Sequence, residues 1–398
     1  MIGTGLGDLA KGFSFSLQTR VEYGMGISKK IADEILRCHG TRVLVVTDPG
    51  VSEAGLVSPL AGLLKKRGIP FVIFDRVEEN PRAKTVDHVA GIAVEQGVDT
   101  IVAVGGGSSL DAAKGVAAVA SHGGTISDYE GFGRLPPPVI PLIAIPTTAG
   151  TGSEVTNRAV ITDGAKKRKI TVGKPNLAPS VALVDPELTF TLPPAITAST
   201  GIDALTHAIE AYTVLCSNPL SDALALHAIE LISGYLGQAV ERGHDPEARS
   251  AMMLGSLLAG ISFGNASVAA VHSMAEVLGG IFDVPHGVAN AIFLPYVMGF
   301  NLPAAQDRLA RIGWTMGAGG TDSSPAPEAA RQAVFRVYGL VKELGIPSLR
   351  KTGVSWNDLD HLAAVTYQTA KTPYNARDME EADFLELFRK AFKEEEPV

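Results

Sequence analysis

Five short runs of apolar residues divide the first half of the chain. They are VLVV, FVIF, IVAV, LIAI and VALV, at residues 43–46, 71–74, 101–104, 142–145 and 181–184. Runs of this length, rich in β-branched residues and without polar alternation, predict strands that are buried on both faces. Segments with helical periodicity lie between the first three runs. This alternation predicts a parallel, doubly wound α/β sheet with right-handed crossovers.

Two further features complete the predicted domain organisation. A polar turn, GAKKR at residues 164–168, separates apolar stretches at residues 159–163 and 169–172, which predicts a surface β-hairpin. After a Pro-Pro pair the pattern changes, because the remainder carries Ala, Leu and Ile at helical spacing and almost no β-branched runs. The predicted domains are an α/β domain, residues 1–195, and an all-α domain, residues 196–398.

One stretch in the second half has the length of a membrane span. Residues 250–275 carry no formal charge, and a run of that length raises the possibility of a transmembrane helix. Ser, Asn and His side chains and several glycines interrupt the run, and polar groups at that density are costly in lipid unless they face protein. We therefore expect a pair of helices buried in a large core and no membrane partner.

Composition narrows the class of protein. Hydrophobic residues make up 46% of the 398 residues and charged residues 19%, which predicts a large folded core. The formal net charge of −8 argues against binding to nucleic acid or to an anionic membrane surface. Cys38 and Cys216 are the two cysteines and form no CxxC motif, which favours a reducing, cytoplasmic compartment. The N-terminal sequence MIGTGLGDLAKGF lacks the pattern of a signal peptide.

A glycine-rich turn follows the third predicted strand. The sequence GGGSSLD at residues 105–111 leads directly into a predicted helix. Glycines at a strand-to-helix turn let backbone N–H groups approach a phosphate, and the helix N-terminus favours negative charge. The spacing differs from GxGxxG, so an ordinary tight turn remains the alternative. Its position after a parallel strand favours a nucleotide site.

Two other strand ends carry candidate cofactor residues. Asp48 follows the first predicted strand, where a carboxylate can accept hydrogen bonds from a ribose 2′-hydroxyl and repel a 2′-phosphate. The alternative for Asp48 is a loop residue that caps the next helix. The sequence PTTAGTGSE at residues 146–154 follows the fourth strand and is either a second phosphate or ribose site or a Ser/Thr-rich turn. Asp48 and the glycine turn together favour NAD over NADP.

Four residues in the second half have the chemistry of metal ligands. Asp203 and His207 are four residues apart in GIDALTHAIEAY and therefore share one face of a helix. His272 and His286 lie fourteen residues apart in uncharged, apolar surroundings, where a buried histidine without a partner is costly. Three imidazoles and one carboxylate suit a first-row divalent metal and leave a position open for substrate. The alternative for each histidine is a hydrogen-bonded core or surface residue.

The charge of the second half bears on the substrate. Between residues 196 and 300 there is no lysine, and Arg242 and Arg249 are the only arginines. A site in this half has few cations to bind a phosphate or a dicarboxylate, which favours a small uncharged substrate. Arg158, in the first half, is the cation that could still reach the cleft.

These motifs together resemble the iron-containing alcohol dehydrogenases, a family that includes lactaldehyde and 1,3-propanediol oxidoreductases. The similarity runs from YGMG at residues 23–26 to the helical tail, and its motifs are GGGSSLDAAK, PTTAGTGSEVT, GIDALTHAIEAY and PHGVANAIFLP. The resemblance implies an N-terminal dinucleotide-binding α/β domain, a C-terminal helical domain and an active site between them. It implies NAD-dependent oxidation of a small primary alcohol or diol, and a homodimer.

The resemblance also implies roles for individual residues. The metal would be held by the same four residues, Asp203, His207, His272 and His286, with iron expected and zinc as the alternative. Two of the implied NAD contacts, Asn80 and Lys169, otherwise look like loop residues. The full set of implied NAD contacts is Asp48, Asn80, Gly106, Gly107, Ser108, Ser109, Asp111, Thr147, Thr148, Thr151, Thr156 and Lys169.

One position departs from the family pattern. Several family members carry a histidine four residues after the third metal ligand, often followed by proline, whereas this chain has Glu276 and Val277. Glu276 is therefore either a proton acceptor in place of that histidine or a satisfied helix carboxylate.

Two other functions compete with the dehydrogenase. A sugar-phosphate lyase of the dehydroquinate synthase type has a similar architecture and also uses NAD and a metal, but it needs a cluster of cations that the second half lacks. A non-catalytic nucleotide-binding regulator has no need for four metal ligands in apolar surroundings.

Overall fold

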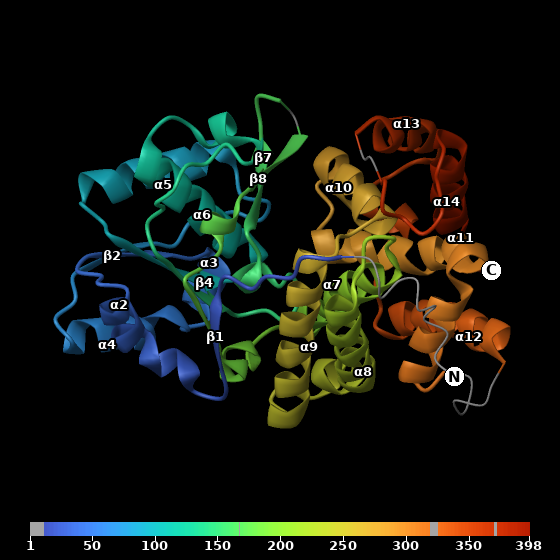
Figure 1. The fold of residues 1–398 in the computed structure, drawn as a ribbon, viewed down its shortest axis with the longest axis horizontal. Coiled ribbons are helices and arrows are strands. Elements are labelled where there is room, and N and C mark those ends of the chain that lie inside the picture. Colours follow the sequence, from blue (N-terminus) through green and yellow to red (C-terminus); the bar gives the residue numbers. More distant parts are fainter. Residues whose placement is uncertain (1–11, 167, 319–324, 370–371) are drawn as a thin grey trace.

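The computed structural model describes residues 12–166, 168–318, 325–369 and 372–398. An α/β half and a helical half lie side by side (Figure 1). The larger sheet has six parallel strands in the order β1-β9-β6-β4-β2-β3. Its strands are β1 (Arg20–Tyr23), β2 (Val43–Val46), β3 (Phe71–Phe74), β4 (Thr100–Gly105), β6 (Leu142–Pro146) and β9 (Val181–Val184). The predicted parallel α/β sheet is thus confirmed.

Helices cover both faces of this sheet. The helices of this half are α2 (Ile31–Arg37), α3 (Pro49–Glu53), α4 (Val57–Lys66), α5 (Ala83–Glu95) and α6 (Gly107–His122). Successive residues of each strand point to opposite faces. Accordingly, Val43 and Val45 of β2 pack with α2 and α4, while Leu44 and Val46 pack with α5 and α6. Because both faces of such a strand are covered, side chains at successive positions are all apolar.

The two edges of the sheet depart from the sequence prediction. The run FVIF forms β3, but it is an edge strand, and Ile73 is 39% exposed. The expectation that this run is buried on both faces was therefore wrong. The opposite edge strand, β1, was not predicted because its sequence RVEY lacks an apolar run. The N-terminal residues 1–11, on which the expectation about a signal peptide rests, lie outside the described residues.

A second, three-stranded sheet stands beside the parallel one. It has the order β5-β8-β7, with β5 (Gly131–Phe132), β7 (Arg158–Asp163) and β8 (Arg168–Gly173). The antiparallel β7–β8 pair confirms the predicted hairpin. The inward-facing side chains of β7 pack on α5 and α6, so its other face is free to line the space between the two halves.

The second half is helical, as predicted. Its helices are α7 (Pro194–Thr213), α8 (Pro219–Glu241), α9 (Pro246–Asn265), α10 (Ala270–Phe282), α11 (His286–Thr315), α12 (Ala326–Glu343), α13 (Leu359–Thr369) and α14 (Glu381–Lys393). Helix α7 lies at the centre and is buried along most of its length, against α8, α9 and α11. The start of α7 lies close to the domain boundary predicted at residue 195, which stays a prediction.

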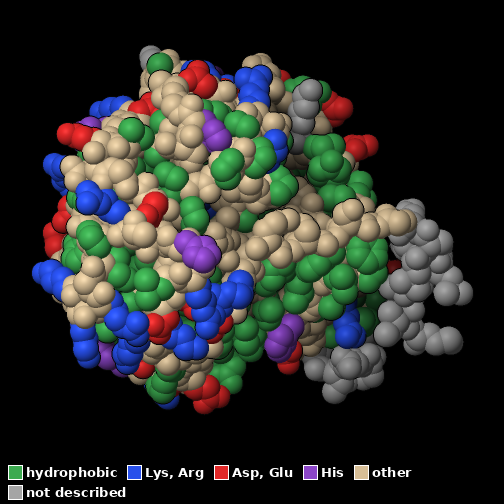
Figure 2. All heavy atoms as spheres, turned by 60° about the vertical axis from the view of Figure 1, so that its left-hand side comes forward, with side chains coloured by type: hydrophobic (Ala, Val, Ile, Leu, Met, Phe, Trp, Pro, Cys, Tyr) green, Lys and Arg blue, Asp and Glu red, His purple; other side chains and the backbone are tan. Residues whose placement is uncertain are grey.

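Several of these helices have the length and hydropathy of membrane spans. Helices α8 and α11 qualify singly, and α9 with α10 qualify as a pair bent by 102°. All four helices contribute side chains to one shared hydrophobic core. The uncharged stretch at residues 250–275 therefore forms a packed helix pair in this structure, as expected. On the face drawn in Figure 2, Lys and Arg side chains are interspersed with Asp and Glu.

The two halves touch through backbone. Gly152, in the loop after β6, lies against Gly260 in the middle of α9. A Cβ atom added at Gly260 would lie 2.8 Å from Cα of Gly152, which is closer than side-chain carbons approach backbone atoms. This approach is possible because both residues lack a Cβ atom.

Candidate metal and nucleotide site

Three helices bring the four candidate metal ligands together. Helix α7 presents Asp203 and His207 from adjacent turns, α10 carries His272, and α11 begins with His286. One ligand-type atom from each residue lies within 4.8 Å of the others. The clustering expected from the sequence is thus present in the structure.

The chemistry of this cluster suits a divalent metal. Burial lowers the pKa of His207 to about 4 and the pKa of His286 to about 3, so both imidazoles are neutral at physiological pH. Neutral imidazole is the form that binds a metal. Nδ1 of His207 is buried and has no hydrogen-bond partner among the described residues, so the cluster contains a polar atom that the protein alone does not satisfy.

Two residues beside the cluster were missed in the sequence. The carboxylate of Glu210 accepts a hydrogen bond from Nδ1 of His272 at 2.6 Å. Nδ2 of Asn290 lies 2.6 Å from Oδ1 of Asp203 and 3.1 Å from Nε2 of His286. Their spacing was a usable signal, because Glu210 follows Asp203 by seven residues and Asn290 follows His286 by four, so each shares a helix face with a ligand.

The expected nucleotide residues meet at one edge of the sheet. Strands β6, β4 and β2 are neighbours, so the loops at their carboxyl ends lie together, where parallel α/β sheets bind ligands. Asp48 follows β2 and accepts a hydrogen bond from the Ser109 hydroxyl at 2.8 Å. Gly105 has a φ of 152°, and a Cβ atom there would lie 2.6 Å from Cβ of Ser109. Glycine is therefore required for the turn to bring Asp48 and Ser109 together.

The structure shows Asp48 in the alternative role of a helix cap. Its Oδ1 accepts a hydrogen bond from the backbone N–H of Val51 at 3.0 Å and caps α3. Its Oδ2 accepts the hydrogen bond from the Ser109 hydroxyl. The carboxylate is therefore held in a fixed orientation at the end of β2.

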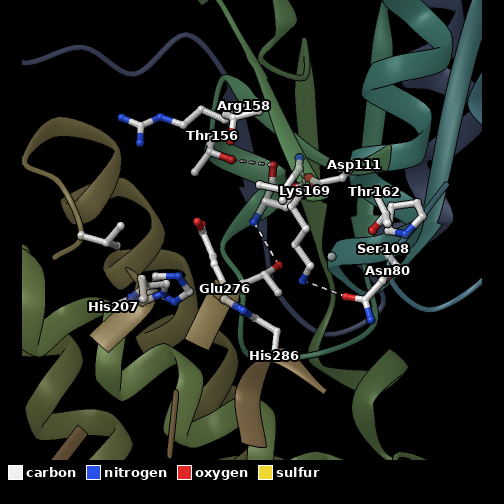
Figure 3. Close-up of a pocket in the computed structure, with 18 of the residues that line it drawn as sticks. Asn80, Ser108, Asp111, Thr156, Arg158, Thr162, Lys169, His207, Glu276 and His286 are labelled. Atoms are coloured by element: carbon white, nitrogen blue, oxygen red, sulfur yellow. Dashed lines mark hydrogen bonds between the residues drawn. The ribbon is translucent and has the colours of Figure 1, made fainter. Parts of the chain in front are cut away.

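A cavity of about 210 Å³ lies between the nucleotide residues and the metal cluster. In Figure 3, His207, Glu276 and His286 rise from the helical half toward Thr156, Asp111 and Lys169 of the α/β half. Seven expected cofactor residues line it: Asn80, Gly107, Ser108, Asp111, Thr151, Thr156 and Lys169. The other five surround the turns behind it: Asp48, Gly106, Ser109, Thr147 and Thr148.

A buried lysine connects the elements on the cofactor side of the cavity. Lys114 is fully buried, and its Nζ donates to the Ser153 hydroxyl at 2.6 Å and to the carbonyl of Arg158 at 2.7 Å. Asp111 lies 3.4 Å from the same Nζ and accepts a hydrogen bond from Ser153. The network joins α6, β7 and the loop after β6. Lys114 was missed as a site residue.

A chain of hydrogen bonds next to the cavity connects the α/β half with the helical half. Lys169 donates to the side-chain oxygen of Asn80 at 2.9 Å (Figure 3), and Nδ2 of Asn80 donates to Asp283 at 3.1 Å. Asp283 caps the C-terminus of α10 and belongs to the helical half, so this contact links the two halves. The two expected cofactor residues Asn80 and Lys169 thus meet, although they are far apart in sequence.

The remaining charged groups of the cavity are Glu276 and Arg158. Glu276 points into the cavity and remains accessible to cavity water (Figure 3). Desolvation by the surrounding cavity walls raises the pKa of Glu276, against the opposing attraction of His272 and Lys169. Two cations of the first half, Arg158 and Lys169, line the cavity. The cavity therefore contains more positive charge than the sequence of the second half alone indicates.

Comparison with known proteins gives consistent matches along the whole chain. Residues 18–186 match the iron-containing alcohol dehydrogenase pattern, and residues 197–392 match the C-terminal pattern of the same family. Choline dehydrogenase from Bacillus subtilis is 39% identical over 387 residues, which is 96% of each chain. NAD-dependent methanol dehydrogenase from Bacillus methanolicus is 37% identical over 92% of this chain and 97% of its own. A crystal structure of 1,3-propanediol oxidoreductase superimposes with a TM-score of 0.93 at 38% identity, over 96% of this chain and 100% of the other.

Proposed function

This chain belongs to the iron-containing alcohol dehydrogenase family, and from that premise we propose how its residues carry out the reaction. It is an NAD-dependent oxidoreductase that acts on the alcohol group of a small molecule, with a divalent metal and NAD as cofactors. The observation that carries the residue assignment is the convergence of four ligand-type side chains on one wall of a cavity whose opposite wall contains the nucleotide turns.

We propose that Asp203, His207, His272 and His286 hold the metal. A metal bound there supplies Lewis-acid polarisation of the substrate oxygen. The ring of Phe263 stacks on His207 at 4.3 Å between centroids and fixes its orientation. These ligands bind both iron and zinc, so availability decides which metal occupies the site.

We propose that the α/β half places the nicotinamide against this wall. The N-terminus of α6 at Gly107 and Ser108 receives the pyrophosphate, because its N–H groups and helix dipole favour a phosphate. Lys169 and Asn80 bind the nicotinamide ribose, since both line the cavity. Phe263 and Val268 form an apolar part of the wall and limit the access of water to the hydride path.

The substrate we propose is a small primary alcohol or diol. The cavity of about 210 Å³ has to receive the nicotinamide and the substrate together, which favours a small substrate. Relatives are named for choline, methanol and 1,3-propanediol, so the family accommodates several such substrates. Glu276 offers an acceptor and Arg158 a donor, and a second hydroxyl on the substrate can use both. We also propose a cytoplasmic homodimer with no nucleic-acid or membrane partner.

The test of this function is NADH formation with a panel of short alcohols and diols. Metal-free protein is reloaded separately with Fe²⁺ or Zn²⁺, and NADP⁺ is run in parallel. We expect metal-dependent formation of NADH in proportion to the alcohol consumed. The contradicting result is turnover of a sugar phosphate with no net formation of NADH. It would show that the cofactor is recycled, as in a lyase of the dehydroquinate synthase type.

We propose that Glu276 accepts the proton released when the alcohol is oxidised. Replacing Glu276 with glutamine is expected to lower kcat about 100-fold, the contribution typical of a positioned acid–base group. The carboxylate is the basic form and desolvation raises its pKa, so the wild-type rate rises as pH passes upward through that raised pKa. The glutamine variant should lack this rise while it retains metal and binds NAD. Identical pH profiles for both proteins would show that Glu276 is only a helix carboxylate.

We propose that the charge of Asp48 excludes NADP. Asparagine is a good N-cap, so Asp48→Asn keeps the cap of α3 and removes the charge that repels a 2′-phosphate. We expect the kcat/KM ratio of NAD to NADP to fall about 10-fold or more, since juxtaposed like charges cost several kcal/mol.

A matched control is available for this substitution. Asp245 is also an N-cap followed by proline, at the start of α9, so Asp245→Asn makes the same chemical change in the helical half. This control should leave the cofactor ratio unchanged. If the kcat/KM ratio of NAD to NADP were also unchanged in Asp48→Asn, Asp48 would have no role in cofactor selection.

A further inference from the structure

The side chain of Glu210 connects two of the helices that form the metal cluster. It projects from α7, three residues after His207, and only 4% of it is exposed. One oxygen, Oε2, accepts from Nδ1 of His272 at 2.6 Å and from the backbone N–H of Ala269 at 3.0 Å. The other oxygen, Oε1, accepts from the backbone N–H of Val271 at 2.7 Å. Both oxygens are therefore occupied by groups at the start of α10.

These contacts determine which ring nitrogen of His272 faces the cluster. An ionised carboxylate only accepts hydrogen bonds, so Nδ1 of His272 must carry the proton in the contact with Glu210. A neutral imidazole then has its lone pair on Nε2. Nε2 lies 3.2 Å from Asn290, whose amide also contacts Asp203 and His286, so this nitrogen is the one directed at the other ligands.

The same carboxylate fixes the position of the helix that carries His272. Helix α10 has no side-chain cap of its own at its N-cap residue, and Glu210 accepts from the N–H group of that residue, Ala269, and from Val271 in the first turn. Because Glu210 lies on α7 together with Asp203 and His207, it fixes α10 to the helix that supplies half of the proposed ligands. A shift of α10 would otherwise change the ligand geometry directly.

We propose that Glu210 is a positioning residue of the metal centre, which holds His272 with Nε2 toward the metal and strengthens it as a ligand. The proposal rests on the metal site proposed above. A carboxylate that accepts from the second nitrogen of a ligating imidazole fixes its tautomer and raises its basicity. Glu210 therefore acts through His272, without contact to the substrate or the nicotinamide.

The experiment measures metal affinity in Glu210→Gln. The probe is Co²⁺, titrated into metal-free protein against a chelator and followed by its visible absorption. Glutamine has nearly the same size, but its NH₂ group can donate to Nδ1 of His272 and move the ring proton to Nε2. We expect Co²⁺ affinity to fall about 10- to 100-fold, with a changed absorption spectrum and unchanged affinity for NAD. Glu210→Asp, which keeps the charge, should recover part of the loss.

A surface pair provides the matched control. Glu230 lies 3.3 Å from Nδ1 of His227 on the solvent-exposed face of α8, so Glu230→Gln also removes a carboxylate beside a histidine, but away from the cluster. The control should bind Co²⁺ like the wild type. Equal Co²⁺ affinity and equal spectra in Glu210→Gln and the wild type would overturn the role of Glu210. Wild-type protein that binds no Co²⁺ would overturn the metal site itself.

Two further measurements separate positioning from folding. His272→Ala loses its metal during purification, but three ligand-type side chains remain, so its weak Co²⁺ binding is titrated at high Co²⁺ concentration. In that background Glu210→Gln should cause no additional loss of Co²⁺ affinity, because a residue that acts through His272 has nothing left to position. An additive loss would overturn the proposal.

If Glu210→Gln fails to fold, the ring ¹⁵N spectrum of the wild-type, zinc-loaded protein tests which ring nitrogen of His272 carries the proton. We expect the resonance absent from His272→Ala to show a proton on Nδ1, and a proton on Nε2 would refute the proposal.

Discussion

Replacing His272 with alanine is expected to abolish metal retention and turnover while NAD binding stays close to wild type. His272 is one of four converging ligand-type side chains, and it lies on the helical wall of the cavity. Loss of the metal removes Lewis-acid stabilisation of several kcal/mol, so we expect kcat to fall by about 1,000-fold or more. Metal content is measured on the purified protein, and NAD affinity by calorimetry.

The exposed residue His227 supplies a control for this prediction. His227→Ala removes an imidazole from the surface of α8, and it should change neither metal content nor turnover. A His272→Ala protein that keeps full activity without metal would refute the proposed metal site. If metal and NAD binding were lost together, the two walls of the cavity would not be the separate binding surfaces described above.

Replacing Lys114 with methionine is expected to destabilise the α/β half by about 3 kcal/mol, as when one partner of a buried ion pair is removed. Methionine fills the same space, but Asp111 loses its cation, and the Ser153 and Arg158 acceptors lose their donor. The midpoint of urea unfolding should fall accordingly. Because Asp111 and Ser153 line the cavity, NAD affinity should fall as well.

The control is a lysine on an exposed face of the same half. Lys66 lies in the last turn of α4 and is exposed, so Lys66→Met removes the same charge without a buried network. We expect its unfolding midpoint to stay within the range of ordinary surface substitutions, about 0.5 kcal/mol. A Lys114→Met protein as stable as this control would show that the network contributes no net stability.

The central strands could be predicted because burial on both faces leaves an uninterrupted apolar run in the sequence. The edges could not be predicted in the same way. β1 has the sequence RVEY, and β3 looks as apolar as β2, although Ile73 is exposed. Which strand stands at an edge depends on strand order, and strand order is decided by packing between segments far apart in the chain.

The candidate metal ligands were predictable for a similar reason. Asp203 and His207 have helical spacing, and uncharged surroundings distinguish His272 and His286 from the other histidines. Glu210 shares the helix of the first pair, yet its role depends on α10, which begins about 60 residues later. Lys114 follows an ordinary helix pattern, and it is buried where β7 and the loop after β6 meet α6. Such roles arise from tertiary contacts that one sequence does not display.

The contact between Gly152 and Gly260 limits the spacing between the two walls of the cavity, across which the proposed hydride transfer takes place. Gly152 lies between Thr151 and Ser153, which both line the cavity, and Gly260 lies one turn before Phe263. A methyl group on Gly260 would have to move from 2.8 Å to about 3.4 Å from its neighbour, and the two walls would separate by part of that difference. A misplacement of about 1 Å costs roughly 100-fold in rate. How closely the two walls of the cavity approach at this point is therefore limited by two main chains in contact, and no change of side-chain rotamer there can relieve a clash.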